Sequence, residues 1–143
     1  MKLAIMQPYF FPYVGYFQLL NNVDKFIFYD DVNYIKQGWI NKNNFLIGKK
    51  AHPFSVPVAK QSSFKLISET EINHQLYKKW KGKFLRSIEQ SYKKAPFFDE
   101  VFPVIKDVFK KEYQTISELA IQSTKALCNY LEINTTPEQL SEK

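Results

Sequence analysis

The stretch KLAIMQPYFFPYVGYFQLLNNVDKFIFY, residues 2–29, decides the fold class. It opens with a short apolar run, residues 2–7, which Pro8 ends, and it closes with residues 25–29, which are rich in aromatic and β-branched side chains. Both runs are typical of buried strands. Between them, residues 15–22 have the pattern of a short helix. A strand, a helix and a strand within about 30 residues predict a βαβ unit, whose two strands pair in parallel.

The rest of the chain extends this unit with a hairpin and several helices. Residues 39–47 and 53–58 are two strand-like runs on either side of a Gly-Lys-Lys turn, and residues 66–72 predict a further strand. Helical patterns follow over residues 73–92, 98–113 and 115–131. The last of these helices begins at a capping box, Thr115-x-x-Glu118. The predicted fold class is therefore α/β, a small Rossmann-like sheet, parallel or mixed, with a C-terminal group of about three helices.

Composition places the 143-residue chain among ordinary globular proteins, with 45% apolar and 24% charged residues. We expect one α/β domain over residues 1–133 and a loose polar tail over residues 134–143. No apolar run reaches the ~18 residues of a membrane helix, and no signal peptide is predicted. The single cysteine, Cys128, excludes an intrachain disulfide and favours the reducing cytoplasm.

Positive charge is concentrated in one helix. The formal net charge of the chain is +6, and residues 78–94 alone contain seven basic side chains against Glu89. The apolar residues of this segment recur at helical spacing, so Lys79 and Lys83 are expected on the opposite, solvent-facing side. Arg86 is the only arginine, which leaves no set of arginines to read bases. We therefore predict weak attraction to polyanions and no specific nucleic-acid partner.

Polar side chains follow both strands of the βαβ unit. The first strand ends at Gln7, and the second ends at Asp30 and Asp31. Because ligands bind beyond the carboxyl ends of parallel strands, we expect a site here, covered by the aromatic loop 9–17. Asp30 and Asp31 are the predicted catalytic residues, which would orient hydroxyls or accept a proton from an amine. The residues predicted to bind substrate are Gln7, Tyr9, Tyr13 and Tyr16. The alternative is that the rings belong to the core and the aspartates form a turn.

A second candidate segment is KQGWINKN, residues 36–43. Its lysines and amides suit phosphate or sugar oxygens, and the predicted ligand-binding residues are Lys36, Trp39, Asn41 and Lys42. The alternative is a polar turn with one packed tryptophan. His52 and His74 lack partners at metal-ligand spacing, so no metal site is predicted. The four scattered glycines form no phosphate-binding loop, and the cofactor stays unknown.

Several long motifs resemble the WbqC-like family of bacteria. They are MQPYFFPYVGYFQLL (residues 6–20), VDKFIFYDDVNYIKQGWINKNNFL (23–46), VPV (56–58), Trp80 and YKKAPFF (92–98). Members of this family often lie in gene clusters for surface polysaccharides such as O-antigen. For some members, transfer of an amino acid such as glycine to an amino sugar has been suggested. Members usually continue well beyond residue 143, so the resemblance implies a chain that is short at its C-terminus.

The leading hypothesis is a transferase that places a small group, an amino acid or an acyl group, on an activated amino sugar during O-antigen biosynthesis. Its small-molecule substrate would be a nucleotide sugar or a lipid-linked sugar. One alternative is a non-catalytic binding or scaffold protein, and another is a truncated homologue that binds a nucleotide or nucleotide sugar. The sequence leaves the oligomeric state open.

Overall fold

The βαβ unit predicted from residues 2–29 is present in the structure, a computed structural model that describes residues 1–142. β1 (Leu3–Met6) and β2 (Lys25–Phe28) pair in parallel, with Ala4 opposite Phe26. The helix α1 (Val14–Asn21) connects them. A third strand, β5 (Pro137–Gln139), pairs in parallel with the other edge of β2, which gives the order β1-β2-β5.

The strand β5 lies in the segment that we expected to be a loose tail. Pro137 is buried opposite Phe26, and the side chains of Gln139 and Ser141 donate hydrogen bonds to Asp30. The sequence of this segment is polar and carries no strand pattern, but β2 offers it an unpaired edge. The segment is therefore part of the sheet. Lys143 lies outside the described residues.

The predicted hairpin is also confirmed, although its second strand covers Lys50–Ser55 and not residues 53–58. β3 (Lys42–Ile47) and β4 (Lys50–Ser55) are antiparallel, with Leu46 opposite Ala51. Gly48 and Lys49 form the two-residue turn, with φ values of 55° and 67°. Two successive positive φ values are what a tight hairpin turn requires, because they match the twist of the strands.

The strand predicted over residues 66–72 is wrong. Residues Ile67–Glu69 form a 3₁₀ turn, and only isolated bridges flank it, at Leu66, Glu71 and Ile72. The Glu69 carboxylate accepts from the Leu66 N–H at 3.3 Å, and the Thr70 hydroxyl donates to the Leu66 carbonyl at 2.9 Å. These local side-chain bonds compete with a strand ladder and close the chain into a turn.

The three predicted C-terminal helices are α2 (His74–Tyr92), α3 (Phe98–Val108) and α4 (Ile116–Tyr130). The capping box is present at α4. Thr115 Oγ1 accepts from the Glu118 N–H, and the Glu118 carboxylate accepts from the Thr115 N–H, both at 3.3 Å. The fold class is thus confirmed as mixed α/β, with a small parallel sheet, an antiparallel pair and these helices.

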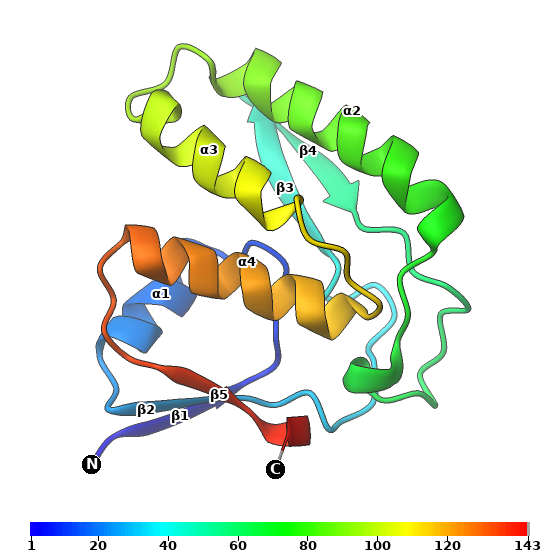
Figure 1. The fold of residues 1–143 in the computed structure, drawn as a ribbon, viewed down its shortest axis with the longest axis vertical. Coiled ribbons are helices and arrows are strands. Elements are labelled where there is room, and N and C mark those ends of the chain that lie inside the picture. Colours follow the sequence, from blue (N-terminus) through cyan, green and yellow to red (C-terminus); the bar gives the residue numbers. More distant parts are fainter. Residues whose placement is uncertain (143) are drawn as a thin grey trace.

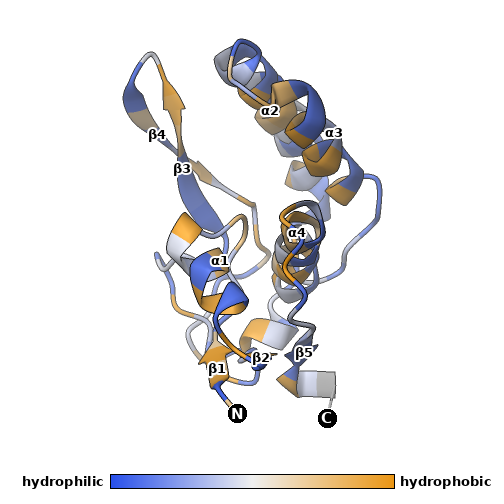
Figure 2. Cartoon of the chain, turned by 90° about the vertical axis from the view of Figure 1, so that its left-hand side faces the viewer, coloured by the Kyte–Doolittle hydropathy of each residue, from blue (hydrophilic) through white to orange (hydrophobic). Residues whose placement is uncertain are grey.

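Two apolar clusters meet at α4. Figure 1 shows the sheet at one end of the molecule, covered on one face by α1 and α4, with the hairpin, α2 and α3 at the other end. Ile121 and Cys128 of α4 belong to the cluster over the sheet, whereas Ile116 and Leu119 belong to the cluster under α2 and α3. Figure 2 shows the hairpin and the α2–α3 pair rising on opposite sides of the same end of the molecule.

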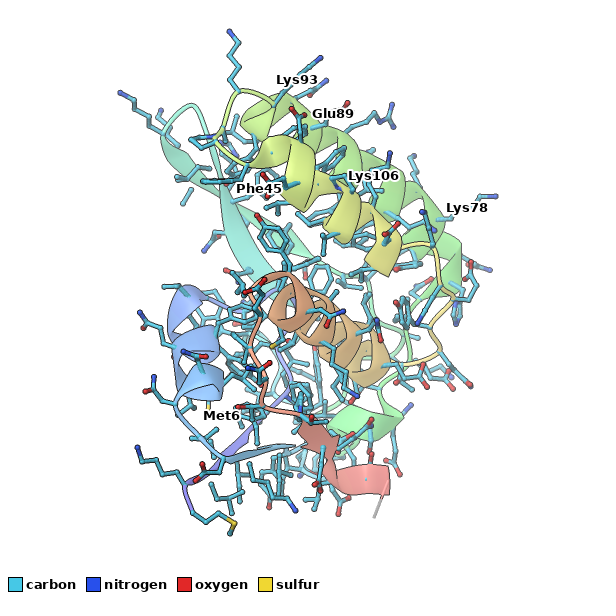
Figure 3. The ribbon with its side chains drawn as sticks, turned by 60° about the vertical axis from the view of Figure 1, so that its left-hand side comes forward. Met6, Phe45, Lys78, Glu89, Lys93 and Lys106 are labelled. Atoms are coloured by element: carbon cyan, nitrogen blue, oxygen red, sulfur yellow. The ribbon has the colours of Figure 1, made fainter. Side chains whose placement is uncertain are left out.

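The helix α2 has the orientation that its sequence predicts. Tyr77 and Phe84 are buried, whereas Lys79 and Lys83 are exposed. Figure 3 shows Lys78 and Lys93 projecting from the two ends of this region into solvent. Across residues 1–142, no helix has both the length and the apolar character needed to cross a membrane.

Candidate functional site

The aromatic loop after β1 is held between α4 and the hairpin. The Phe10 N–H donates to the Ile40 carbonyl at 3.0 Å, and the Phe11 N–H donates to Ser123 Oγ at 3.1 Å. The Asn43 amide donates to the Phe11 carbonyl at 2.7 Å. Phe11 has a φ of 44°, a conformation that is costly for a residue with a side chain and that often occurs at functional sites. These three bonds hold the loop in this conformation.

The rings of this loop divide between the core and the surface. Phe10 is fully buried in the cluster under α2, and Tyr16 is fully buried over the sheet. The Tyr16 hydroxyl donates to the Gln7 carbonyl at 2.8 Å, and burial raises the pKa of this phenol above its ordinary value. Tyr16 is therefore a core residue, whereas Tyr9 and Tyr13 remain accessible.

The accessible rings line a pocket of about 200 Å³. Its lining residues are Tyr9, Pro12, Tyr13, Trp39, Asn43 and Asn44. Tyr13 is 61% exposed and Trp39 is 54% exposed, so both rings have a free face for a ligand. Carboxamides both donate and accept hydrogen bonds. The arrangement suits a ligand with apolar faces and hydroxyl groups, because aromatic rings pack on the former and amides bond to the latter.

Gly15 leaves room for the Tyr13 ring. A Cβ atom at position 15 would be 2.4 Å from Tyr13 Cε2 and 3.1 Å from Cδ2. The ring therefore lies against the first turn of α1, in space that any larger residue would occupy. This close approach explains why a glycine is present in a helix, where it costs about 1 kcal/mol relative to alanine.

A larger cleft adjoins the pocket, with a volume of about 310 Å³. The walls come from the hairpin, α2, the α2–α3 turn and α3, together with Phe11. Asn43 and Asn44 line both the pocket and the cleft, so the two spaces are neighbours. The other lining residues of the cleft are apolar except Tyr92.

Asp30, predicted to be catalytic, lies in neither space. Its side chain is fully buried and accepts four hydrogen bonds. Oδ2 accepts from Ser117 Oγ at 3.1 Å, Gln139 Nε2 at 2.6 Å and Ser141 Oγ at 2.7 Å, and Oδ1 accepts from the Ser141 N–H at 3.0 Å. Asp30 thus holds the segment after β5 against α4. Asp31 is exposed and also lines neither space.

Asn41, predicted to bind a ligand, is buried with an exposed fraction of 2%. Its Oδ1 accepts from the Tyr34 hydroxyl at 2.8 Å, and its Nδ2 donates to the Val56 carbonyl at 3.0 Å. Burial raises the pKa of Tyr34 to about 12, so this hydroxyl stays protonated as the donor. Lys36 is exposed, Lys42 is half-buried, and neither lines the pocket.

Of the predicted site residues, the structure brings together Tyr9, Tyr13 and Trp39. Asn43 and Asn44 were not among the predicted site residues. The available signal was a pair of consecutive carboxamides at the start of a strand, where asparagine is disfavoured. In residues 1–142 there is no group of three or more His, Cys, Asp or Glu side chains that could hold a metal ion.

Comparison with known families identifies the chain. The model of the WbqC-like protein family matches residues 7–143. The chain belongs to this WbqC-like family. The match includes every residue that lines the pocket and the cleft.

This WbqC-like chain is similar to an uncharacterized protein of Mycobacterium tuberculosis. The two are 34% identical over 136 residues, which cover 94% of this chain and 58% of the relative. The chain therefore spans about three fifths of the length of the curated relative that it matches. No solved structure matches the chain significantly.

Proposed function

We propose that this WbqC-like chain binds an amino sugar in the pocket, and that it is a transferase that adds an amino acid or acyl group to this sugar in bacterial surface polysaccharide. The observation that carries the proposal is the composition of the pocket, in which Tyr9, Tyr13 and Trp39 are joined by two carboxamides. A sugar ring presents C–H groups to aromatic faces and hydroxyls to amides. The family context of polysaccharide gene clusters supports the same class of substrate.

The transfer step would form an amide bond between the sugar amine and the carbonyl carbon of an activated donor. The bond from that carbonyl to the donor's oxygen or sulfur breaks, and the leaving group departs with the electron pair. A base must accept the proton that the amine loses. Asp31 is the predicted carboxylate for this role and is exposed, but it lines neither the pocket nor the cleft, so it would have to accept the proton through intervening water. The oxygens of Asp30 are bonded to protein groups.

One observation favours a second candidate, a sugar-binding module without chemistry of its own. Among the described residues, those lining the pocket and the cleft include no carboxylate and no histidine. Such a module would bind the sugar and leave the transfer to a further domain or partner.

Binding is tested by isothermal titration calorimetry with nucleotide-linked and free amino sugars. Trp39→Ala is expected to lower affinity about tenfold, as for the loss of roughly 1.4 kcal/mol of ring packing. Phe64→Ala is the matched control, since Phe64 is 94% exposed and lines neither space. Equal affinity in wild type and Trp39→Ala would contradict the proposed pocket.

The two candidates differ in turnover. The purified chain is incubated with an amino sugar and aminoacyl esters or thioesters, and the amide product is measured by mass spectrometry. A transferase gives product that Asp31→Asn reduces while sugar affinity is unchanged. Sugar binding without product in any donor mixture indicates the binding module.

A further inference from the structure

The apolar cleft beside the pocket lies between the hairpin on one side and α2, α3 and their turn on the other. The helices and their turn line it with side chains that are apolar except Tyr92, among them Phe84, Phe98, Val101 and Phe102. From the hairpin, Phe45 and Phe54 face them, and Figure 3 shows Phe45 on this side of the cleft. The Phe54 and Phe84 rings are 4.9 Å apart and form the closed end between hairpin and α2.

The walls are fixed by specific bonds. The Tyr92 hydroxyl accepts from the Leu46 N–H at 2.8 Å, which joins the end of α2 to β3. Phe98 and Phe102 stack with their centroids 4.8 Å apart, which stiffens the wall on α3. The apolar side chains that line this open cleft are in contact with water, and an apolar ligand that covers them removes this surface from water.

We propose that this cleft binds an alkyl chain, so that the ligand is an amphipathic lipid-linked sugar with its head in the pocket and its chain in the cleft. The inference rests on the proposed function for the head. The main support is that the pocket and the cleft are continuous. Asn43 and Asn44 line both spaces, so they lie at the junction where a sugar would meet its lipid. The lining supports it too, since Tyr92 and these two amides are the polar residues of the cleft within residues 1–142.

The charge pattern agrees with a ligand of this kind. The turn that forms one end of the cleft carries Lys93 and Lys94, both exposed, and Asp99 and Glu100 follow on α3. These four charges balance, and none lines the cleft. The interior is thus uncharged, which favours an aliphatic chain over the charged groups of a nucleotide.

The test is a calorimetric series of methyl, hexyl, heptyl and octyl β-D-glucosides, each below its critical micelle concentration. In the longer members, each added methylene is expected to raise affinity about fourfold, which is the free energy of burying one methylene. Equal affinity for methyl and octyl glucoside would overturn the alkyl site and leave the sugar pocket standing.

Two variants of Val101 connect the series to the cleft. Val101→Phe fills the space and should abolish the fourfold steps while methyl glucoside still binds. Val101→Ala enlarges the space and should retain the steps, and thermal melting establishes that both variants fold. Trp39→Ala should weaken every glucoside by one common factor. If the fourfold steps persist in Val101→Phe, the alkyl chain binds elsewhere and the inference is wrong. If Trp39→Ala changes no affinity, the proposed sugar pocket is wrong, and so is the placement of the sugar head in it.

Discussion

Asp30→Asn tests whether the buried carboxylate is structural. Asp30 has an exposed fraction of 0% and no cation is bonded to it in the part of the chain described. Its charge is compensated instead by four donors on Ser117, Gln139 and Ser141. An asparagine has nearly the same shape, but one oxygen becomes an NH₂ group that faces a donor and cannot accept from it.

The expected cost follows from these bonds. If the NH₂ replaces Oδ1, the Ser141 N–H loses its acceptor, and the three bonds to the other oxygen lose their charge assistance. A hydrogen bond to a charged group contributes about 1.5–3 kcal/mol and a neutral one about 0.5–1.5 kcal/mol. Gln139 and Ser141 are close enough to solvent to bond with water, which reduces the sum. We expect Asp30→Asn to lower the free energy of unfolding by about 2–4 kcal/mol.

The assay is urea denaturation followed by circular dichroism at pH 7. Asp31→Asn is the matched control, since it makes the same change on the neighbouring exposed residue and should alter the free energy of unfolding by less than about 0.5 kcal/mol. Amide exchange at Gln139 and Ser141 should accelerate in Asp30→Asn, because β5 loses its anchor. A stable Asp30→Asn variant that no longer binds sugar would refute this reasoning and return Asp30 to the site.

Three further predictions concern other parts of the chain. Asn41→Ala should lower the free energy of unfolding by about 2–4 kcal/mol in urea denaturation, because it leaves the Tyr34 hydroxyl unpaired, while calorimetric sugar affinity is unchanged. Burial raises the pKa of Cys128 to about 11 from 9.0, so its thiol should resist Ellman's reagent at pH 8 until urea unfolds the chain. The contribution of the buried thiol to stability, measured by urea midpoints, should be complete below pH 9 and lost as the pH rises through 11. Heparin binding should be weak, should decrease as salt rises in a retention assay, and should disappear in Lys79→Glu with Lys83→Glu without change in sugar affinity.

The sequence predicts most of the fold because its local patterns agree with the final packing. The pattern of each segment is visible in the sequence: two apolar strands, at residues 2–7 and 25–29, and a helix after Tyr13. Because a helix connects the two strands, they pair in parallel as a βαβ unit. The two failures have different causes. β5 depends on a non-local partner, the open edge of β2, whereas the turn at Ile67–Glu69 is closed locally by the Glu69 carboxylate, which accepts from the Leu66 N–H.

The candidate site is harder to predict, because a residue type does not reveal which partner it will find. Asn41 and Asn43 are two positions apart, yet Asn41 is enclosed by Tyr34 and Val56 whereas Asn43 lines the pocket. Asp30 follows β2 as a catalytic carboxylate would, but its donors come from residues about 90 to 110 positions away. Spacing along the chain carries no information about such contacts.

Asn43 shows how the fold and the pocket depend on each other. One N–H of its amide donates to the Phe11 carbonyl at 2.7 Å, and its Oδ1 accepts from the Asn44 N–H at 2.8 Å. A carboxamide has two N–H donors and two acceptor positions, so one of each remains for a ligand. Removing Asn43 would therefore release the aromatic loop as well as a ligand contact. The amide of Asn44 has no such structural bond in the described chain. A substitution of Asn44 would therefore test ligand recognition alone, whereas a substitution of Asn43 would also change the position of the loop.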